Sequence, residues 1–347
     1  MNLLWSIAYL AAGGCIFVYL MNRYFIAMAR GWGKNPTIAL VSFATLLLPA
    51  AAGWLIDGPL RPAFPAIVFT AAIAGEVHRL AIRRRHRGVR PVASGNGRVD
   101  LLRPFTTTDL AVTHYAIVVP GWAGPRIRIA HVTDFHASPS LPSSFYRNAL
   151  ELAAQAKPDF LFVTGDFVSD ERNLPILEEA LPAAAGVARR IAVLGNHDYW
   201  ADPEEVARVV RAAGFDLLSN DHRVFEFGAG RAVVCGCDDP WGPARWTKPP
   251  VSNGDLFLVL SHTPDNIYEL NRAGAHAVFS GHLHAGQFRI PWLGAVAVPS
   301  LFGRRYDHGH FNVEGTHLFV SAGIGANFPP IRVYCPPDLF VVDVSGC

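Results

Sequence analysis

The residues best suited to chemistry in this sequence stand at the ends of five short apolar runs. The ends read DFH at 134–136, GD at 165–166, GNHD at 195–198, SH at 261–262 and GHLH at 281–284. Turns favour Asp, Asn and Gly, and a close pair of histidines is easily accidental in a chain with 14 of them. Five polar ends in succession, however, favour one shared site.

The mixture of side chains at these ends is typical of a divalent metal site. Carboxylate, amide oxygen and imidazole together suit Mn, Fe, Co or Zn, and differ from a thiolate zinc site. Asp134 and His136 alternate along the chain, so a bend after the strand can turn both inward. The two oxygens of an Asp can bridge two ions. Asn196 offers a neutral oxygen, which preserves more of a metal's Lewis acidity than another carboxylate would.

The elements that must position these residues alternate between β-rich and helical patterns. Such alternation predicts an α/β fold with helices outside a sheet, and ligands of such sheets bind beyond the carboxyl ends of the strands. Asp202, followed by a proline, predicts a capped helix start. We expect strands at 116–122, 126–134, 157–166, 189–198, 222–227, 231–236, 255–261, 276–280 and 339–344, and helices at 143–156, 174–188, 202–213 and near 264–273.

In this order and at this spacing, the five pieces resemble the calcineurin-like metallophosphoesterases. The steps of 32 residues from Asp134 to Asp166 and 30 from Asp166 to Asn196 are similar to those of that family, and the resemblance covers roughly residues 114–345. It implies a four-layer α/β/β/α sandwich that hydrolyses a phosphoric ester or pyrophosphate bond with two divalent metal ions. Manganese is the first expectation, with Fe, Zn, Co or Mg as alternatives.

The resemblance also implies a role for each matching residue. His197 would face the leaving group as a general acid or charge stabiliser, and Asp198 would orient its imidazole. Two metals held close together would activate the attacking water and stabilise the developing charge. The implied ligands are Asp134, His136, Asp166 and His284 for one metal, and Asp166, Asn196, His262 and His282 for the other.

Three longer stretches are similar to a membrane-associated bacterial branch of this family, which includes UDP-2,3-diacylglucosamine hydrolases. They read GHLHAGQFRIP, CGCDDPWG and GANFPPIRVYCPPDL. Leu283 and Ala285 depart from the branch pattern, in which Thr and Gly are frequent, and this departure bears on substrate fit. The favoured substrate is lipid-linked, such as UDP-2,3-diacylglucosamine cleaved to UMP and the lipid phosphate. Phospholipid, nucleotide and phosphoprotein substrates stay open, as does a non-enzymatic membrane sensor.

The composition divides the chain into two parts of different character. The whole is 51% hydrophobic and 17% charged, which is apolar for a soluble protein. Residues 1–100 hold 11 Lys and Arg against 3 Asp and Glu, whereas residues 101–347 hold 19 against 25. The first part is therefore basic and the second acidic. An acidic domain is a poor general binder of nucleic acid, so we expect no nucleic-acid partner.

Three apolar stretches in residues 1–85 predict a membrane anchor. Residues 3–21 and 38–56 are each long enough to cross a bilayer, and residues 63–82 either cross it or lie in its interface. Positive residues collect on the cytoplasmic side. If all three stretches cross the membrane, the basic residues after the first stretch and those after the third lie on the same, cytoplasmic side. If only two cross it, the two groups of basic residues lie on opposite sides. These groups are Arg23, Arg30 and Lys34 after the first stretch, and Arg79, Arg83, Arg84, Arg85, Arg87 and Arg90 after the third.

This topology predicts a multi-pass inner-membrane protein with its catalytic domain in the cytoplasm and its N-terminus outside. We expect a basic juxtamembrane linker at 86–110, flexible near 92–98, and a metallophosphoesterase domain at 111–347. The five cysteines are interpreted as free thiols. Further residues are open between a surface role and a contact with substrate phosphate: Arg289, Arg304, Arg305, Arg332, His308 and His310.

Overall fold

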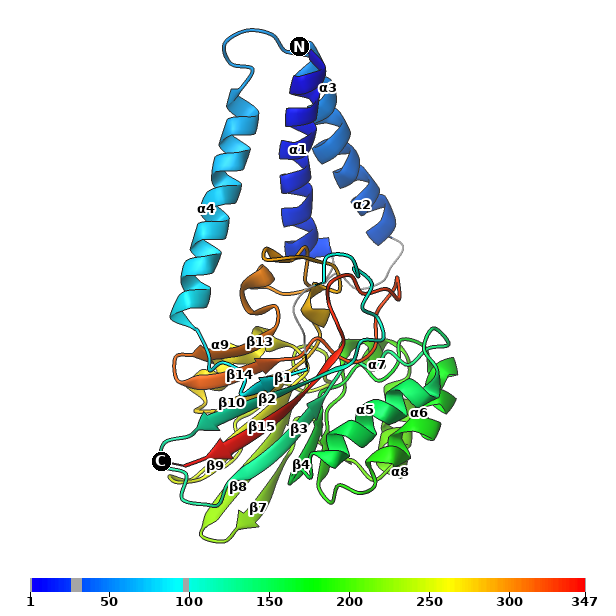
Figure 1. Cartoon of the computed structure of the whole chain (residues 1–347), viewed down its shortest axis with the longest axis vertical. Helices are drawn as coiled ribbons and strands as arrows, with labels where there is room; N and C mark the ends of the chain where they lie inside the picture. The colour runs from blue at the N-terminus through cyan, green and yellow to red at the C-terminus, as the bar shows by residue number, and fades with distance from the viewer. Residues whose placement is uncertain (1, 26–32, 96–99, 347) are drawn as a thin grey trace. The chain divides into compact units, whose positions relative to one another are not determined.

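The structure is a computed structural model that describes residues 2–25, 33–95 and 100–346 (Figure 1). Arg30 of the predicted basic loop lies outside the described residues, as do the side chains of Arg23 and Lys34. The chain divides into two compact units. The helical unit is Met1–Arg85 with Val296–Arg305, and the sandwich unit is His86–Ala295 with Tyr306–Cys347.

The helical unit contains three apolar helical segments. They are α1 (Asn2–Leu20), the continuous run of α2 (Lys34–Ser42), a π-helical turn (Phe43–Leu47) and α3 (Leu48–Leu55), and α4 (Ala63–Arg85). A second π-helical turn, Met21–Phe25, follows α1. Asn2–Leu20, Asn35–Leu55 and Ala63–Arg85 are each long and apolar enough to cross a membrane. The expectation of three apolar helices in this region is thus confirmed, including the weaker third one.

Small residues bring these helices into close contact. A Cβ atom on Gly13 would stand 1.7 Å from the backbone oxygen of Thr45, so only glycine fits there. The segment 296–305 also belongs to this unit, although the sequence places it within the C-terminal domain. Asn22 explains the difference, because its Nδ2 donates to Val296 O (3.2 Å) and its Oδ1 accepts from Val298 N (2.7 Å).

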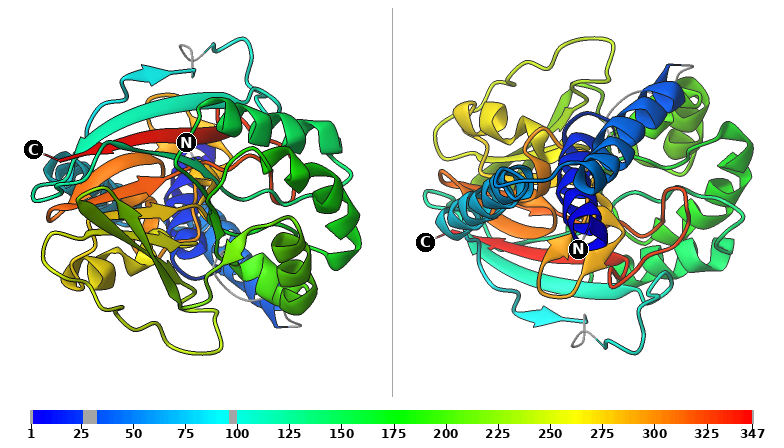
Figure 2. Two further views of the ribbon diagram at one scale, coloured as in Figure 1. Left: turned by 90° about the horizontal axis from the view of Figure 1, so that it is seen from below. Right: turned by 90° about the horizontal axis from the view of Figure 1, so that it is seen from above.

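The sandwich unit contains two large sheets (Figures 1 and 2). In spatial order the first is β1 (Ala93–Ser94), β2 (Ala111–Val118), β15 (Asp338–Ser345), β3 (Ile127–Val132), β4 (Phe160–Val163), β5 (Arg190–Ala192) and β6 (Asp216–Leu217). The second is β13 (Gly309–Val313), β14 (Thr316–Val320), β10 (Ala277–Ser280), β9 (Leu256–Ser261), β8 (Gly230–Cys237) and β7 (His222–Phe227). A two-stranded ribbon joins β11 (Arg289–Ile290) to β12 (Gly294–Ala295).

Two hydrophobic cores hold the layers together. One forms between the two sheets, where Phe162 of β4 meets Phe279 of β10 with ring centroids 5.2 Å apart. The other lies between the first sheet and its helices, and includes Leu150 and Val206. Because β4 is covered on both faces, its FLFV sequence is continuously apolar rather than alternating. The helices are α5 (Ser143–Gln155), α6 (Leu174–Ala180), α7 (Asn196–Trp200), α8 (Pro203–Ala212) and α9 (Ile267–Arg272).

The mixed α/β organisation predicted from the sequence is confirmed. The expected strand at 222–227 is found at those residues, and Asp202 caps α8 by accepting from Glu205 N at 3.1 Å. A layer of helices was also expected outside the second sheet. Among the described residues this fourth layer is small, and α9 is the α-helix that contacts β13 of that sheet. The predicted flexible link also differs, because Val92 and Gly95 donate backbone hydrogen bonds to β2. Residues 96–98 of that link lie outside the described part.

Candidate metal centre

The five polar ends predicted to form a site converge at one edge of the two sheets. β3, β4 and β5 are parallel neighbours in the first sheet, and β9 and β10 are parallel neighbours in the second. Carboxyl ends of parallel strands lie at the same edge, so the residues that follow each strand meet there. All seven expected ligands are buried, and none is more than 9% exposed.

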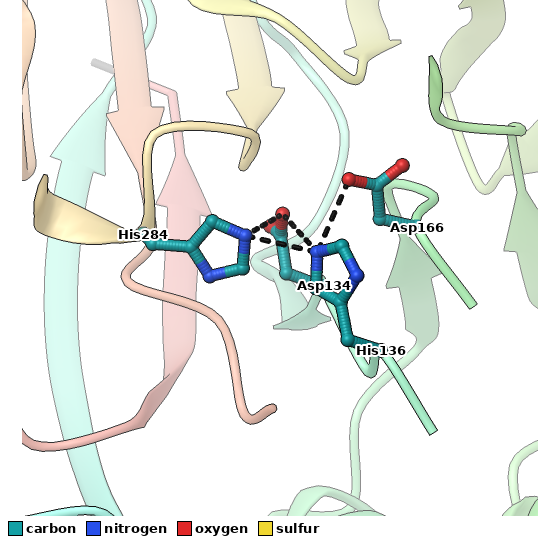
Figure 3. Close-up of side chains that lie close together, drawn as sticks. All are labelled: Asp134, His136, Asp166 and His284. Atoms are coloured by element: carbon teal, nitrogen blue, oxygen red, sulfur yellow. Dashed lines mark hydrogen bonds and ion pairs between the residues drawn. The ribbon is translucent and has the colours of Figure 1, made fainter. Parts of the chain in front are cut away.

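Four of these side chains form the first cluster, in which the ligand atoms point toward one another (Figure 3). His136 Nε2 lies 3.3 Å from Asp166 Oδ2, and His284 Nε2 lies 3.3 Å from Asp134 Oδ1. The two Nε2 atoms are 2.9 Å apart. One ligand atom from each of the four residues lies within 4.8 Å of all the others, which is compact enough to surround a single ion.

A second cluster shares Asp166 with the first. His262 Nε2 lies 3.2 Å from Asp166 Oδ2 and 3.1 Å from Asn196 Oδ1, and His282 completes the group. Nδ1 of His262 lies 2.6 Å from the carbonyl oxygen of Thr164, which fixes the ring so that Nε2 faces the site. The structure thus brings together both residue sets expected from the sequence, with Asp166 common to the two.

The backbone at this edge adopts an uncommon conformation. Five of the seven expected ligands have positive φ angles: Asp134 (52°), His136 (40°), Asp166 (54°), His282 (67°) and His284 (48°). Non-glycine residues rarely occupy this left-handed region, although Asp and His tolerate it better than most. Strained backbone of this kind clusters at functional sites, where the surrounding fold imposes it.

Two glycines make room for the carboxylates. A Cβ atom on Gly281 would stand 2.0 Å from Asp134 Oδ2, and one on Gly195 would stand 2.2 Å from Asp166 Oδ1. No side chain fits at either position without displacing a carboxylate. The glycine before His282 and the glycine before Asn196 are therefore required by packing against the neighbouring strand end.

Burial and mutual charge shift the pKa values in this site. Burial raises the pKa of Asp134, and the charge of Asp166 adds to that rise. Burial opposes ionisation of Asp166 too, but the nearby imidazoles of His262 and His197 hold the pKa of that carboxyl well below its usual range. Burial lowers the pKa of His282 to about 3, so its ring is neutral at pH 7, as a metal ligand must be.

The donor set fits divalent cations. Two imidazole nitrogens 2.9 Å apart, each also facing a carboxylate oxygen, form a stable arrangement when positive charge lies among them. Both clusters combine carboxylate oxygens with imidazole nitrogens, which suits borderline ions such as Mn, Fe, Co or Zn. The assignment of individual ligands to two metals stays a prediction, which this geometry supports.

Comparison with known proteins identifies the domain. The calcineurin-like phosphoesterase family matches residues 127–286, a range that contains all five polar ends. The chain therefore contains a calcineurin-like metallophosphoesterase domain. The chain is similar to phosphodiesterase YaeI of Escherichia coli, with 26% identity over 259 residues that cover 69% of this chain and 94% of YaeI. This family is one of metal-dependent phosphoester hydrolases, so the enzyme class expected from the sequence is confirmed.

Two further relatives come from other bacteria. The uncharacterized metallophosphoesterase YkuE of Bacillus subtilis is 24% identical over 272 residues, which cover 75% of this chain and 93% of YkuE. The UDP-2,3-diacylglucosamine pyrophosphatase LpxG of Chlamydia muridarum is 26% identical over 279 residues, which cover 62% of this chain and 83% of LpxG. The matched regions span most of each relative's length.

The expected catalytic pair of the metallophosphoesterase domain lies at the start of α7. His197 borders the first cluster, with its ring centroid 4.6 Å from that of His136. The carboxylate of Asp198 accepts backbone hydrogen bonds from Gly195 N (2.9 Å) and Val168 N (3.1 Å). Nδ1 of His197 instead lies 2.9 Å from Ser169 Oγ. The role of Asp198 in orienting the imidazole stays a prediction, and the observed bonds show it holding the turn that carries His197.

Sequence reasoning missed three residues beside this metallophosphoesterase site. Ser169 Oγ lies between the Nδ1 atoms of two rings, at 2.7 Å from His136 and 2.9 Å from His197. Asn327 Nδ2 lies 3.2 Å from His197 Nε2. The Trp241 ring lies 5.1 Å from that of His282. Ser169 follows Asp166 by three residues, which is a usable signal. Asn327 is remote in sequence, and its signal is its position in the stretch GANFPPIRVYCPPDL.

The residues left open by the sequence now have positions in the structure. Arg332 is fully buried and donates to the carbonyl oxygens of Ala322 and Gly325, so it braces the loop behind Asp134 rather than meeting substrate. Arg289 pairs with Asp307 at 3.1 Å. The other side chains also have protein partners: Arg304 with Glu76, Arg305 with the Phe302 ring, His308 with Asp338, and His310 with His317.

Proposed function

We propose that this chain is a membrane-anchored dimetal phosphoesterase that hydrolyses a phosphodiester or pyrophosphate bond of a lipid-linked substrate. The observation that carries the proposal is the presence, in one chain, of a phosphoesterase domain and three helices that can each cross a membrane. Anchoring gives an enzyme continuous access to substrates that stay in the bilayer. Similarity to LpxG favours UDP-2,3-diacylglucosamine, cleaved to UMP and the lipid phosphate.

We expect two divalent metal ions at the proposed site, with manganese first and Fe, Zn, Co or Mg as alternatives. When bound, they supply Lewis-acid charge for the phosphoryl oxygens and lower the pKa of a water nucleophile. Asp166 would serve both metals, and this is supported by its Oδ2, which lies 3.3 Å from His136 Nε2 and 3.2 Å from His262 Nε2. The proposed ligand sets are Asp134, His136, Asp166 and His284, and Asp166, Asn196, His262 and His282.

The hydrogen bonds of Ser169 indicate which ring nitrogens of His136 and His197 carry a proton. Its Oγ can accept from the Nδ1–H of both His136 and His197. Each ring then keeps the lone pair of Nε2, which in His136 faces the carboxylates and in His197 faces the Asn327 amide at 3.2 Å. His197 Nε2 is thus the atom that takes up a proton and gives it to the leaving oxygen.

The proposed location is the bacterial inner membrane, with the domain in the cytoplasm. Arg83, Arg84 and Arg85 form the last turn of α4, and a basic cluster at the end of a span favours the cytoplasmic side. Fusing a fluorescent reporter that folds only in the cytoplasm to the C-terminus tests this orientation. Fluorescence supports it, and activity of a periplasm-dependent reporter at the same position contradicts it.

One assay separates the substrate classes. Full-length protein in detergent is incubated with UDP-2,3-diacylglucosamine and Mn²⁺, and release of UMP is measured. UDP-N-acetylglucosamine, which lacks acyl chains, is the matched control substrate, and Asp166→Asn is the matched control enzyme. We expect UMP release only when the native enzyme is combined with UDP-2,3-diacylglucosamine, and not with the control substrate or the control enzyme. Hydrolysis of bis(p-nitrophenyl) phosphate without UMP release would keep a phosphodiesterase but reject the glycolipid substrate. Absence of both activities would favour the sensor alternative.

A further inference from the structure

The sandwich unit carries a second feature beside the metal centre, a small sheet of three paired segments. Val333 is central: its Cα pairs with Phe105 on one side and with Phe288 on the other. Val333 N donates to Gln287 O at 2.9 Å, and Arg289 N donates to Val333 O at 3.0 Å. Segments from three distant parts of the sequence thus form one continuous backbone layer.

The two faces of this layer are inverted relative to an ordinary soluble sheet. Along the central segment, Ile331 is exposed, whereas the next residue, Arg332, is fully buried. Along the neighbouring segment, Phe288 and Ile290 are exposed, whereas Arg289 between them turns inward to Asp307. Side chains alternate between faces along a strand, so the charged side chains face the protein and the apolar ones face outward.

We define the apolar edge as the outward side chains of this layer and of the turns that flank it. Phe105 is 68% exposed, and two turn residues are more exposed still: Leu102 at 91% and Trp292 at 89%. Trp292 also has a φ of 65°, an unfavourable conformation for a bulky residue in a turn that merely has to be soluble. The apolar edge comprises Leu102, Phe105, Phe288, Ile290, Trp292 and Ile331.

The edge is linked directly to the catalytic residues. Gln287, next to Phe288, donates from Nε2 to Asn327 O at 2.9 Å, and its Oε1 accepts from Asn327 N at 3.0 Å. Asn327 in turn contacts His197 Nε2 at 3.2 Å. The residue after Asn327, Phe328, is another exposed aromatic. Whatever contacts the edge is therefore connected through Gln287 and Asn327 to His197, the proposed proton donor.

We propose that the apolar edge inserts into the interfacial layer of a lipid bilayer and seats the metal centre on the membrane surface. The proposal rests on the membrane anchoring in the proposed function and extends it to the sandwich unit itself. Contiguous exposed apolar patches mark interaction sites, and an exposed Trp among aliphatic side chains is typical of the membrane interface. The sandwich unit begins at His86, the residue after the last candidate span. A span in the membrane would therefore keep the sandwich unit at the bilayer surface.

Fluorescence quenching tests the contact without reference to catalysis. Full-length protein is placed in nanodiscs of phosphatidylethanolamine and phosphatidylglycerol, some with lipids brominated near the carbonyl end of the acyl chain. The Trp292 signal is the difference between the native protein and Trp292→Phe. We expect brominated lipid to quench this signal and aqueous iodide to spare it, as for Trp54 in the candidate span Asn35–Leu55. Quenching of Trp292 by iodide alone would overturn the proposal.

Activity measurements provide a second, independent readout. In the double variant Leu102→Asp with Trp292→Asp, we expect kcat/KM on a bilayer-embedded substrate to fall about tenfold or more. Activity on soluble bis(p-nitrophenyl) phosphate should be unchanged, because neither residue belongs to the metal site. Val224→Asp, at an exposed apolar position on β7, is the matched control and should change neither activity.

The outcomes separate the possible occupants of the edge. Loss of activity on the embedded substrate without lipid quenching of Trp292 would contradict bilayer contact and assign the edge to the acyl chains of the substrate. A double variant that changes from oligomer to monomer in detergent, again without quenching, would assign it to a second copy of the chain. Failure of UDP-2,3-diacylglucosamine as a substrate leaves the quenching result intact, so the two proposals fail separately.

Discussion

Two H-x-H motifs in this protein have the same spacing but lie in different environments. His282 and His284 follow the last residue of β10 and point into the metal centre, where Asp134 and Asp166 face the cluster. His308 and His310 instead stand at the start of β13. His308 Nε2 lies 2.5 Å from Asp338 Oδ2, and His310 Nε2 lies 3.0 Å from His317 Nδ1. What distinguishes the motifs is the number of carboxylates and imidazoles that meet around them, since His284 and His282 join clusters that contain Asp134 and Asp166, whereas His308 meets Asp338 alone.

The electrostatic surroundings follow the same division. Burial lowers the pKa of His282 to about 3, and burial together with His317 lowers that of His310 to about 3. Both rings are therefore neutral at pH 7, and neutrality alone does not make a ligand. His310 stacks on Phe319 with centroids 4.5 Å apart, so its environment is that of a packed core. A metal centre requires convergence with carboxylates as well.

The largest expected effect comes from removing the carboxylate shared by both clusters. Asp166→Asn should lower kcat/KM on bis(p-nitrophenyl) phosphate by about 10²–10³-fold or more, the range for losing one electrostatic group in an active site. Metal analysis should show loss from both positions, since Asp166 lies in both groups. Circular dichroism checks that the fold is kept. Full activity with full metal content would remove Asp166 from the site.

An alanine substitution in each of the two H-x-H motifs tests the comparison directly. His284→Ala should lose one metal ion per chain and most of the activity. His310→Ala should keep both metals and lower the free energy of unfolding by about 1–3 kcal/mol, because His317 and Val89 N lose a buried partner. Metal analysis and thermal unfolding in detergent distinguish the two variants. Equal metal loss in both would contradict the distinction drawn between the two motifs.

A smaller effect is expected from the hydroxyl that joins two rings at the centre. Ser169→Ala should lower kcat by about 10–100-fold, as for other partners of metal-ligating histidines, with little change in KM. Ser169→Thr keeps the hydroxyl and should restore most of the rate. Steady-state kinetics with saturating Mn²⁺ measures both. If the Ala and Thr variants behave alike, Ser169 contributes packing and does not position His136 and His197.

The smallest effect concerns the partner of the other H-x-H motif, and it is lost in acid. Burial opposes ionisation of Asp338, yet the adjacent His308 lowers its pKa below the ordinary 3.8. The native carboxyl thus adds stability above about pH 3.8 and loses it as the pH falls through its lower native value. Native protein should exceed Asp338→Asn in stability at pH 6 by about 1–3 kcal/mol. Urea unfolding should show that margin shrinking below pH 3.8, and a margin independent of pH would exclude an ionic contribution.

Local patterns predict most of this fold and nearly all of its metal centre. The five strand ends are visible in the sequence because buried parallel strands read as continuous apolar runs and their polar residues follow at once. The position of β15 between β2 and β3 is not visible, since it depends on pairings such as Val342 with Tyr115 across more than 200 residues. The contact of Asn327 with His197 is hidden for the same reason. The segment 296–305 looks like part of the second domain until the contacts of Asn22 are known.

The left-handed backbone at the strand ends limits what evolution or a designer can do with this centre. A residue at a position such as Asp134 or His282 must meet two requirements: it must offer a ligand atom, and it must tolerate a positive φ angle. Val, Ile and Thr fail the second test even where ligation is no longer wanted. The accessible replacements reduce to Gly, Asn, Asp and His, three of which can ligate metals. Drift at these positions therefore tends to exchange one metal preference for another before it abolishes the site.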